Sequence, residues 1–348
     1  MSVDLQPIPK KTLSTMAEFP PSKIEEIKNI LFQHEYEMME RLGFGGFSVI
    51  FKVYSLKYQN FFAAKITNSA STRHRTSSIA GDIEENALQQ LNHPNIIKLY
   101  ESFHEDNLSF LIIELCTKKS LKDIIGEKGM PESHLFSFMK QLSDALCYCH
   151  SLGFAHRDIK PPNVLIDSYG RPKLADFGMC IHVEPGTLIK DHVGSPSYLS
   201  PEIIKKESFD PFKSDVWAMG VTFYEMTMGL IKWPKDKTLI VASIAEGGIL
   251  IKPETPPKIA MLVRAMTEMN PQKRPDMKRI RNLKMIDEAH ADGVRLSRVS
   301  DCQSHNSNLQ LPRIKISKAQ MSFFNRNQRN KAFKKPRIIT ANTFATGP

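Results

Sequence analysis

Cysteine is scarce in this 348-residue chain, and long hydrophobic runs are absent from it. No stretch approaches the roughly 20 unbroken apolar residues of a membrane span, and the amino-terminal MSVDLQPIPKK lacks the apolar core of a secretory signal. The five cysteines form neither a CxxC pair nor a plausible disulfide framework: Cys116, Cys147, Cys149, Cys180 and Cys302. We therefore expect an intracellular protein with no membrane partner. The expected location is the cytoplasm, and the nucleus stays open as a second one.

Acidic residues are scarce near the carboxyl end, where the positive charge is concentrated. The chain has a formal net charge of +10, and residues 290–348 contribute +9 of it from 11 basic and two acidic side chains. A basic tail suits acidic partners, and Lys334-Lys335-Pro336-Arg337 is a weak nuclear-import candidate. The basic residues of the tail are interleaved with Phe323, Phe324 and Phe333, which could stack on bases. A charge run is more often a solvated tail, however, so nucleic acid is the less favoured partner.

Composition and periodicity divide the chain into three segments. Residues 1–35 form an amino-terminal extension whose apolar spacing predicts a short helix capped by Ser22. Residues 36–287 carry strand patterns first and, after Lys119, mostly helical patterns. This order indicates an α+β fold with a small β-rich lobe and a larger helical lobe. Residues 288–348 are polar and basic, which predicts a tail without stable structure.

A glycine-rich segment lies at the start of the strand-rich region. Its sequence is Gly43-Phe44-Gly45-Gly46-Phe47-Ser48. Glycine lets the backbone approach phosphate groups closely because no Cβ blocks the approach. Turns of this composition are common, so the segment alone indicates a phosphate site only weakly.

Lys65 lies at the end of an apolar strand, after Ala63 and Ala64. A charge in such a place is costly unless another group pairs with it. Glu84, on the helix predicted over residues 81–91, is the natural partner. Taken alone, the segment is equally compatible with a lysine at a strand edge that extends its amine into water.

The strongest signal is His156-Arg157-Asp158-Ile159-Lys160-Pro161-Pro162-Asn163, followed by Asp176-Phe177-Gly178. It brings together a proton acceptor, a cation for developing phosphate charge and two oxygen ligands for Mg²⁺. With the glycine loop and Lys65 ahead of it in the same order, the sequence resembles the eukaryotic protein kinase family over residues 36–287. The resemblance implies a bilobal kinase fold and the cofactors ATP and Mg²⁺.

The resemblance also implies a role for each matching residue. The loop Gly43–Ser48 would cover the ATP phosphates, and Lys65, oriented by Glu84, would hold two of them. Asp158 would orient the substrate hydroxyl and accept its proton, and Lys160 would stabilise the transferring group. Asn163 and Asp176 would bind Mg²⁺. Adenine would lie between the side chains of Ile50 and Ala63 above and Leu165 below, with Ile113 at the rear of its pocket. Backbone groups of Glu114 and Cys116 would contact its edge.

Further landmarks match the family. Glu202 would pair with Arg274, and Asp215 would anchor the catalytic loop. A stacked apolar column would contain Leu88, Leu99, His156 and Phe177. Lys160 with Asn163, and the run Gly194-Ser195-Pro196, resemble serine/threonine kinases, most nearly the calmodulin-dependent and AMP-activated group. The implied partners are protein substrates.

Departures from the family pattern bear on specificity and activation. Ser48 replaces a loop glycine and Ser200 an alanine, both mild changes. Ser120 and Pro162 stand where relatives that prefer basic substrates often carry acids, so we expect no strong demand for arginine before the phosphoacceptor. Asp191 stands where many relatives carry a phosphorylated threonine, and its carboxylate could pair with Arg157. The alternative is a solvated loop aspartate.

Two other functional classes stay open at this stage. The first is a catalytically inert, nucleotide-binding scaffold of kinase fold. The presence of Lys65, Asp158, Asn163 and Asp176 argues against it. The second is a protein whose basic tail carries the main function by binding nucleic acid or acidic partners. A phosphotransfer assay separates the first from a kinase, and salt-dependent binding by the tail tests the second.

Overall fold

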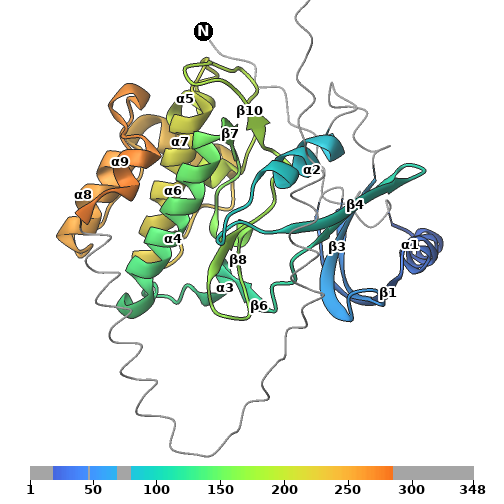
Figure 1. Ribbon diagram of the computed structural model, residues 1–348. Coiled ribbons are helices and arrows are strands. Elements are labelled where there is room, and N and C mark those ends of the chain that lie inside the picture. Colours follow the sequence, from blue (N-terminus) through green and yellow to red (C-terminus); the bar gives the residue numbers. More distant parts are fainter. Residues whose placement is uncertain (1–18, 46–47, 69–79, 285–348) are drawn as a thin grey trace, which may run out of the picture. The chain divides into compact units, whose positions relative to one another are not determined.

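The computed structural model describes residues 19–45, 48–68 and 80–284 (Figure 1). The predictions for residues 1–18, for Gly46 and Phe47, and for the tail 288–348 lie outside these ranges. Within them, the β-sheet and the larger set of helices occupy opposite ends (Figure 1). No helix in this part of the chain is long and apolar enough to cross a membrane.

The small lobe is built on a five-stranded antiparallel sheet with the order β1-β2-β3-β5-β4. Its strands are β1 (Tyr36–Phe44), β2 (Ser48–Ser55), β3 (Asn60–Asn68), β4 (Leu99–Glu105) and β5 (Leu108–Ile113). Because successive side chains in a strand point to opposite faces, β5 splits between two cores. Phe110 and Ile112 pack on one face with helix α1, whereas Leu111 and Ile113 pack on the other face with helix α2.

Helix α1 (Pro21–Gln33) covers the sheet face opposite to α2 (Ala80–Gln90) (Figure 1). Ile27, Ile30 and Leu31 are buried against the strands, as the apolar spacing predicts. The predicted cap is wrong: the helix begins at Pro21, and Ser22 lies inside its first turn. Proline at the first helical position loses no helical hydrogen bond and has a suitable φ, so no side-chain cap was needed to begin the helix here.

The large lobe is organised around two long helices, α4 and α6. Helix α4 (Glu132–Ser151) buries the stripe that includes Leu135, Met139 and Leu146, and helix α6 (Pro211–Met228) is buried along most of its length. The remaining helices are α3 (Leu121–Ile124), α5 (Pro201–Ile204), α7 (Lys237–Gly247), α8 (Pro257–Met266) and α9 (Met277–Arg281). The short strands are β6 (Lys118–Ser120), β7 (Phe154–Ala155), β8 (Val164–Ile166), β9 (Pro172–Leu174) and β10 (Ile181–His182), and the 3₁₀ turns are η2 (Pro161–Asn163), η3 (Pro196–Tyr198) and η4 (Pro271–Lys273).

The two lobes meet at the segments that carry the predicted chemistry. The chain passes from β5 through Glu114 to Thr117 into the large lobe, and the catalytic motifs flank β8 and β9. One apolar core, which contains Leu88 of α2 and Phe177, continues from the small lobe into the large lobe. The predicted α+β bilobal kinase fold is confirmed.

Candidate active site

Lys65, Glu84 and Asp176 form an ion triad in which Lys65 and Glu84 are buried and Asp176 is about half exposed. Lys65 Nζ donates to Glu84 Oε1 and Oε2 at 2.8 and 2.7 Å and to Asp176 Oδ1 at 2.7 Å. Burial alone would lower the pKa of the Lys65 amine, but the two carboxylates outweigh burial and raise it. The charge of Lys65 in turn lowers the pKa of Asp176. β3 is an interior strand and Lys65 is buried, so the alternative of an edge lysine reaching into water is wrong.

The glycine-rich segment lies between β1 and β2 in the chain, and the structure describes its two ends. The strands pair up to Phe44 and Val49, and Gly45 N–H donates to Ser48 O at 2.7 Å, which closes the turn. A Cβ on Gly43 would meet no atom within 4 Å, so the strand end borders open space. Phe44 is largely exposed. At the strand ends that the structure describes, the backbone is therefore accessible to a ligand.

Asp158 lies at the centre of a hydrogen-bonded cluster in the catalytic loop. Lys160 Nζ donates to Asp158 Oδ2 at 2.6 Å and to Ser195 Oγ at 2.8 Å. Ser195 Oγ donates to Asp158 Oδ1 at 2.9 Å. Asn163 Nδ2 donates to both the carbonyl oxygen and Oδ2 of Asp158 at 2.9 Å. The Asn163 amide group is thereby oriented, with its nitrogen toward Asp158.

Asp215 of α6 holds the loop that carries Asp158 through hydrogen bonds to its backbone. Asp215 Oδ2 accepts from His156 N at 2.7 Å, and Oδ1 accepts from Arg157 N at 2.8 Å. His150 Nε2, from α4, lies 2.9 Å from Asp215 Oδ2. The sequence predicted the role of Asp215 but missed His150, whose position in the last turn of a helix carries no separate signal.

Two residues of the site have unusual backbone geometry. Arg157 and Asp176 adopt φ values of +64° and +63°. A non-glycine residue pays about 1–3 kcal/mol in this region, and such strain concentrates at functional sites. Here two contacts hold the strained residues in place. Arg157 N–H donates a hydrogen bond to Asp215, and Asp176 forms an ion pair with Lys65.

The predicted apolar column is present. Leu88, His156 and Phe177 are buried, and Leu99 is packed against the same core. The rings of His156 and Phe177 have centroids 4.7 Å apart, and His156 Nε2 lies 3.1 Å from Ala175 O. The column therefore connects α2, which carries Glu84, to the catalytic loop.

The residues predicted to contact adenine lie in or near the segment that joins the lobes. Ala63 pairs with Ile113 across β3 and β5, Ile50 and Leu165 are partly exposed, and burial raises the pKa of the Cys116 thiol to about 12. Glu114 N–H donates to Lys98 O at 2.8 Å, so its carbonyl oxygen is the backbone group left to contact a base.

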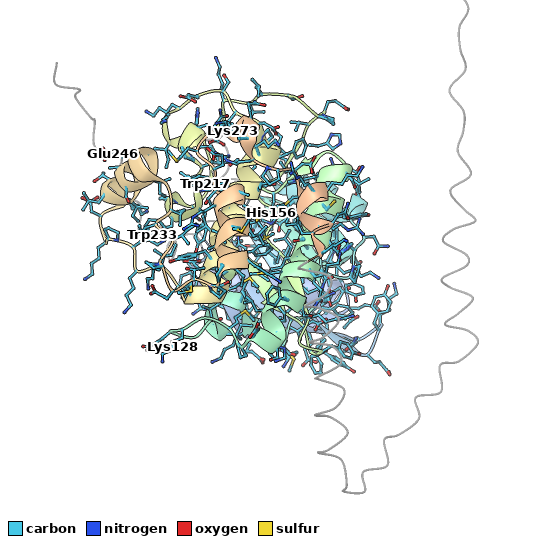
Figure 2. The ribbon with its side chains drawn as sticks, turned by 90° about the vertical axis from the view of Figure 1, so that its left-hand side faces the viewer. Lys128, His156, Trp217, Trp233, Glu246 and Lys273 are labelled. Atoms are coloured by element: carbon cyan, nitrogen blue, oxygen red, sulfur yellow. The ribbon has the colours of Figure 1, made fainter. Side chains whose placement is uncertain are left out.

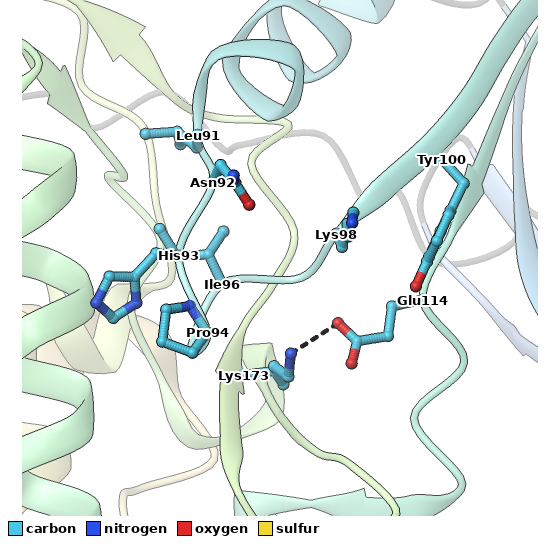
Figure 3. Close-up of a pocket in the computed structure, with 9 residues that line it drawn as sticks. All are labelled: Leu91, Asn92, His93, Pro94, Ile96, Lys98, Tyr100, Glu114 and Lys173. Carbon is cyan, nitrogen blue, oxygen red and sulfur yellow. Dashed lines mark hydrogen bonds and ion pairs between the residues drawn. The ribbon is translucent and has the colours of Figure 1, made fainter. Parts of the chain in front are cut away.

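The Glu114 side chain lines a small pocket of about 250 Å³ and points toward Lys173 (Figure 3). There it accepts a hydrogen bond from Lys173 Nζ at 2.8 Å (Figure 3). Both partners are largely buried, Lys173 at 7% exposure and Glu114 at 19%. This ion pair, which the sequence did not reveal, fixes the connecting segment to β9.

The segment between Asp176-Phe177-Gly178 and Glu202, called the activation segment, is held by two ion pairs. Arg157 Nη1 lies 3.0 Å from Asp191 Oδ2, and Arg157 Nε donates to Met179 O at 2.6 Å. Glu202 and Arg274 form a buried bidentate pair with N–O distances of 2.6 and 2.7 Å, as the sequence predicts. Each end of the segment is thus tied to a charged group of the large lobe.

Comparison with known proteins identifies the same region. The sequence profile of the protein kinase domain matches residues 36–286. The calcium/calmodulin-dependent protein kinase type II of Caenorhabditis briggsae is 34% identical over 254 residues, which are 70% of this chain and 47% of that protein. The type II alpha chain of Drosophila melanogaster is 33% identical over 260 residues, 70% of this chain and 47% of the relative.

A plant relative, CBL-interacting protein kinase 1 of Oryza sativa subsp. japonica, is 33% identical over 252 residues, 69% of this chain and 53% of that protein. The chain thus spans about half the length of these curated relatives. The predicted resemblance to serine/threonine kinases of the calmodulin-dependent group is confirmed. On the profile match and the site geometry together, the chain belongs to the protein kinase family.

Proposed function

We propose that this chain is a serine/threonine protein kinase that transfers the γ-phosphoryl group of ATP to hydroxyl groups of protein substrates. The observation that carries the proposal is the cluster of Asp158, Lys160 and Asn163 opposite the ion triad of Lys65, Glu84 and Asp176. Nothing in the site favours the inert scaffold, because each polar group that the reaction needs is present and oriented by a neighbour.

The residues fit Mg²⁺ when nucleotide phosphates complete its ligand set. Among the described residues, no group of three or more His, Cys, Asp or Glu could hold a metal ion. Mg²⁺ typically binds through one or two carboxylates together with substrate phosphates and water. Asp176, whose side chain is 49% exposed, offers a carboxylate. Asn163, with its amide nitrogen committed to Asp158, offers its amide oxygen. Mg²⁺ bound there would neutralise phosphate charge.

The protein's own groups supply positioning and charge. Asp158 holds its carboxylate within hydrogen-bonding reach of the Ser195 hydroxyl, which supports a role in receiving the substrate hydroxyl and accepting its proton. Lys160 places a cation 2.6 Å from Asp158, where negative charge develops on a transferring group. Lys65, held by Glu84, directs a second cation toward the nucleotide phosphates.

Partners and location extend the proposal beyond the catalytic domain. Protein substrates follow from the family, and the basic residues 288–348 are proposed to bind acidic partners rather than nucleic acid. We also propose an intracellular location, with Lys334–Arg337 as a candidate nuclear-import segment. The net charge of +9 over residues 290–348 supports both points.

The test compares wild type with Asp158→Asn and Asp176→Asn on a peptide array with Mg·ATP. Asp158→Asn should lose turnover by about 10²-fold or more, yet keep nucleotide binding, because Asp158 is placed to act on the hydroxyl. Asp176→Asn should also weaken the rise in melting temperature that Mg·ATP causes. Turnover of Asp158→Asn at the level of wild type would refute the catalytic assignment, and absence of turnover in wild type with intact nucleotide binding would favour the scaffold.

A further inference from the structure

A large groove lies on the helical lobe, outside the nucleotide site. Its volume is about 870 Å³, within the range of ligand and peptide sites. The walls are the turn after α3, the loop between α6 and α7, and the connection from α7 to α8. Figure 2 shows Lys128 and Trp233, which line two of these walls, at the same edge of the lobe.

The rim of the groove is predominantly positive. Lys128, Lys232 and Lys252 line it, against a single acidic lining residue, Glu127. Within the described part of the chain, Lys128 and Lys232 have no ion-pair partner, and Lys252 has only Glu254 at 4.0 Å, with both side chains more than half exposed. Each wall of the groove therefore contributes a solvated cation whose charge is little compensated.

The floor and lip of the groove are apolar. Leu250 is 86% exposed and Leu230 is 36% exposed, and Trp233 is partly buried beside them. Exposed leucines grouped in a concave site differ from singly scattered surface leucines, because a bound apolar side chain would remove both from water. The groove thus combines apolar contact area with positive charge on its rim.

The groove is connected directly to the phosphoacceptor side of the active site. Glu225, buried on α6, accepts from Ile231 N in the groove wall at 3.0 Å and from Tyr198 Oη at 2.8 Å. Tyr198 N–H in turn donates to Ser195 O at 2.9 Å, and the Ser195 hydroxyl contacts Asp158. Hydrogen bonds through Glu225, Tyr198 and Ser195 thus connect the groove wall to Asp158, the residue proposed to receive the substrate hydroxyl.

We propose that this groove docks a segment of the protein substrate that is rich in Asp and Glu and carries apolar side chains. The proposal rests on the proposed kinase function and names a substrate class for it. Charge decides between candidate occupants: the chain's own residues 290–348, at +9, would be repelled by the three lysines. A carboxylate-bearing segment would be attracted by them, and its apolar residues would cover Leu230 and Leu250.

Binding can be measured independently of catalysis, because the chain has only two tryptophans. Trp217 is fully buried and stacks on Arg274 at 5.0 Å, whereas Trp233 lines the groove. A short peptide of alternating Glu and Leu, added to the full-length protein, should change tryptophan fluorescence with saturation, and the change should disappear in Trp233→Phe. A peptide of alternating Lys and Leu should cause none.

Charge reversal tests the rim. Lys128→Glu and Lys232→Glu should each weaken the Glu-Leu peptide by about tenfold, whereas Lys57→Glu, at an exposed turn of the small lobe, should not. Equal weakening by all three variants would refute the groove as the site. Tighter binding of the Lys-Leu peptide, or a fluorescence signal that depends on protein concentration without peptide, would refute an acidic substrate segment as the occupant.

A kinetic comparison separates this proposal from the kinase function. One serine peptide is assayed with and without an attached Glu-Leu segment, and the ratio of the two kcat/KM values is recorded. Wild type and Lys57→Glu should show a ratio well above one, produced by a lower KM, and Lys232→Glu should reduce it toward one. A wild-type ratio of one with measurable turnover refutes the docking groove alone. Absence of turnover on both peptides refutes the kinase function, while the fluorescence titration still decides the groove.

Discussion

The ion pair between Arg157 and Asp191 offers a direct test of how the activation segment is ordered. Asp191 stands where many related kinases carry a phosphorylated threonine, and its Oδ2 lies 3.0 Å from Arg157 Nη1. The same guanidinium donates through Nε to Met179 O. Arg157 therefore connects the catalytic loop to Met179, directly after Asp176-Phe177-Gly178, and to Asp191 further along the same segment. The perturbation is Asp191→Ala, which removes the carboxylate and leaves the Met179 contact in place.

The size of the effect follows from the burial of the two partners. A buried hydrogen bond to a charged group contributes about 1.5–3 kcal/mol, and an exposed ion pair contributes about 0.2–1 kcal/mol. The Arg157 side chain is 9% exposed and that of Asp191 is 63% exposed, so this pair lies between the two cases. We expect a loss of about 1.4 kcal/mol in the ordering of the segment, which corresponds to about tenfold in kcat/KM.

The assay uses protein expressed in bacteria and treated with phosphatase, so that no added phosphate can substitute for the carboxylate. Wild type should be active after this treatment, Asp191→Ala about tenfold less so, and Asp191→Asn similar to Ala because it keeps the shape but lacks the charge. Asp191→Thr should behave like Ala until an upstream kinase phosphorylates it, since a phosphate would restore the charge.

Two results would refute this reasoning. Inactive wild type after phosphatase treatment would show that a phosphate elsewhere, such as on Thr187, is required. An Asp191→Ala variant with unchanged kcat/KM would show that Asp191 is a solvated loop residue and that its contact with Arg157 contributes nothing to the active state.

Three further predictions concern stability and the tail. Ile27→Ala should remove buried contacts of α1 and lower the melting temperature by roughly 6–12 °C, from about 3 kcal/mol, whereas the exposed Phe32→Ala should not. Glu202→Gln should leave Arg274 charged and unpaired in the interior at a cost of about 3–5 kcal/mol, measured by urea unfolding. Deletion of residues 288–348 should keep kcat/KM on a short peptide within a few-fold; complete loss would place the tail in the catalytic assembly.

The catalytic loop could be predicted from the sequence because its chemistry is local. Asp158, Lys160 and Asn163 lie within six residues, and the structure finds their side chains in one hydrogen-bonded cluster. The partnership of Lys65 with Asp176 is different: the two residues are 111 positions apart, and no spacing rule connects them. The sequence did not predict this ion pair: the family resemblance assigned Lys65 to the ATP phosphates and Asp176 to Mg²⁺, and only the structure brings the two side chains into contact.

The features that the sequence missed depend on packing between distant segments. Lys128, Lys232 and Lys252 are ordinary surface lysines in the sequence, and only the packing of three connections around α6 makes them one rim. Helix α1 was expected from its apolar spacing, yet its start was wrong because Pro21 at the first turn outweighed the side-chain cap that Ser22 suggested. Local patterns thus predicted elements better than their boundaries or their shared surfaces.

Charge on the substrate side bears on the expected contrast with relatives that prefer basic peptides. Ser120 and Pro162 supply no charge where those relatives often carry acids. Glu225, an acid near this surface, is 1% exposed and already accepts from both Tyr198 and Ile231 N–H. Burial further raises the pKa of the Glu225 carboxyl, which opposes its use as an exposed anion. Because Glu225 is committed inside the lobe and the rim lysines are exposed, we expect charge on this side to favour acidic substrate segments over basic ones.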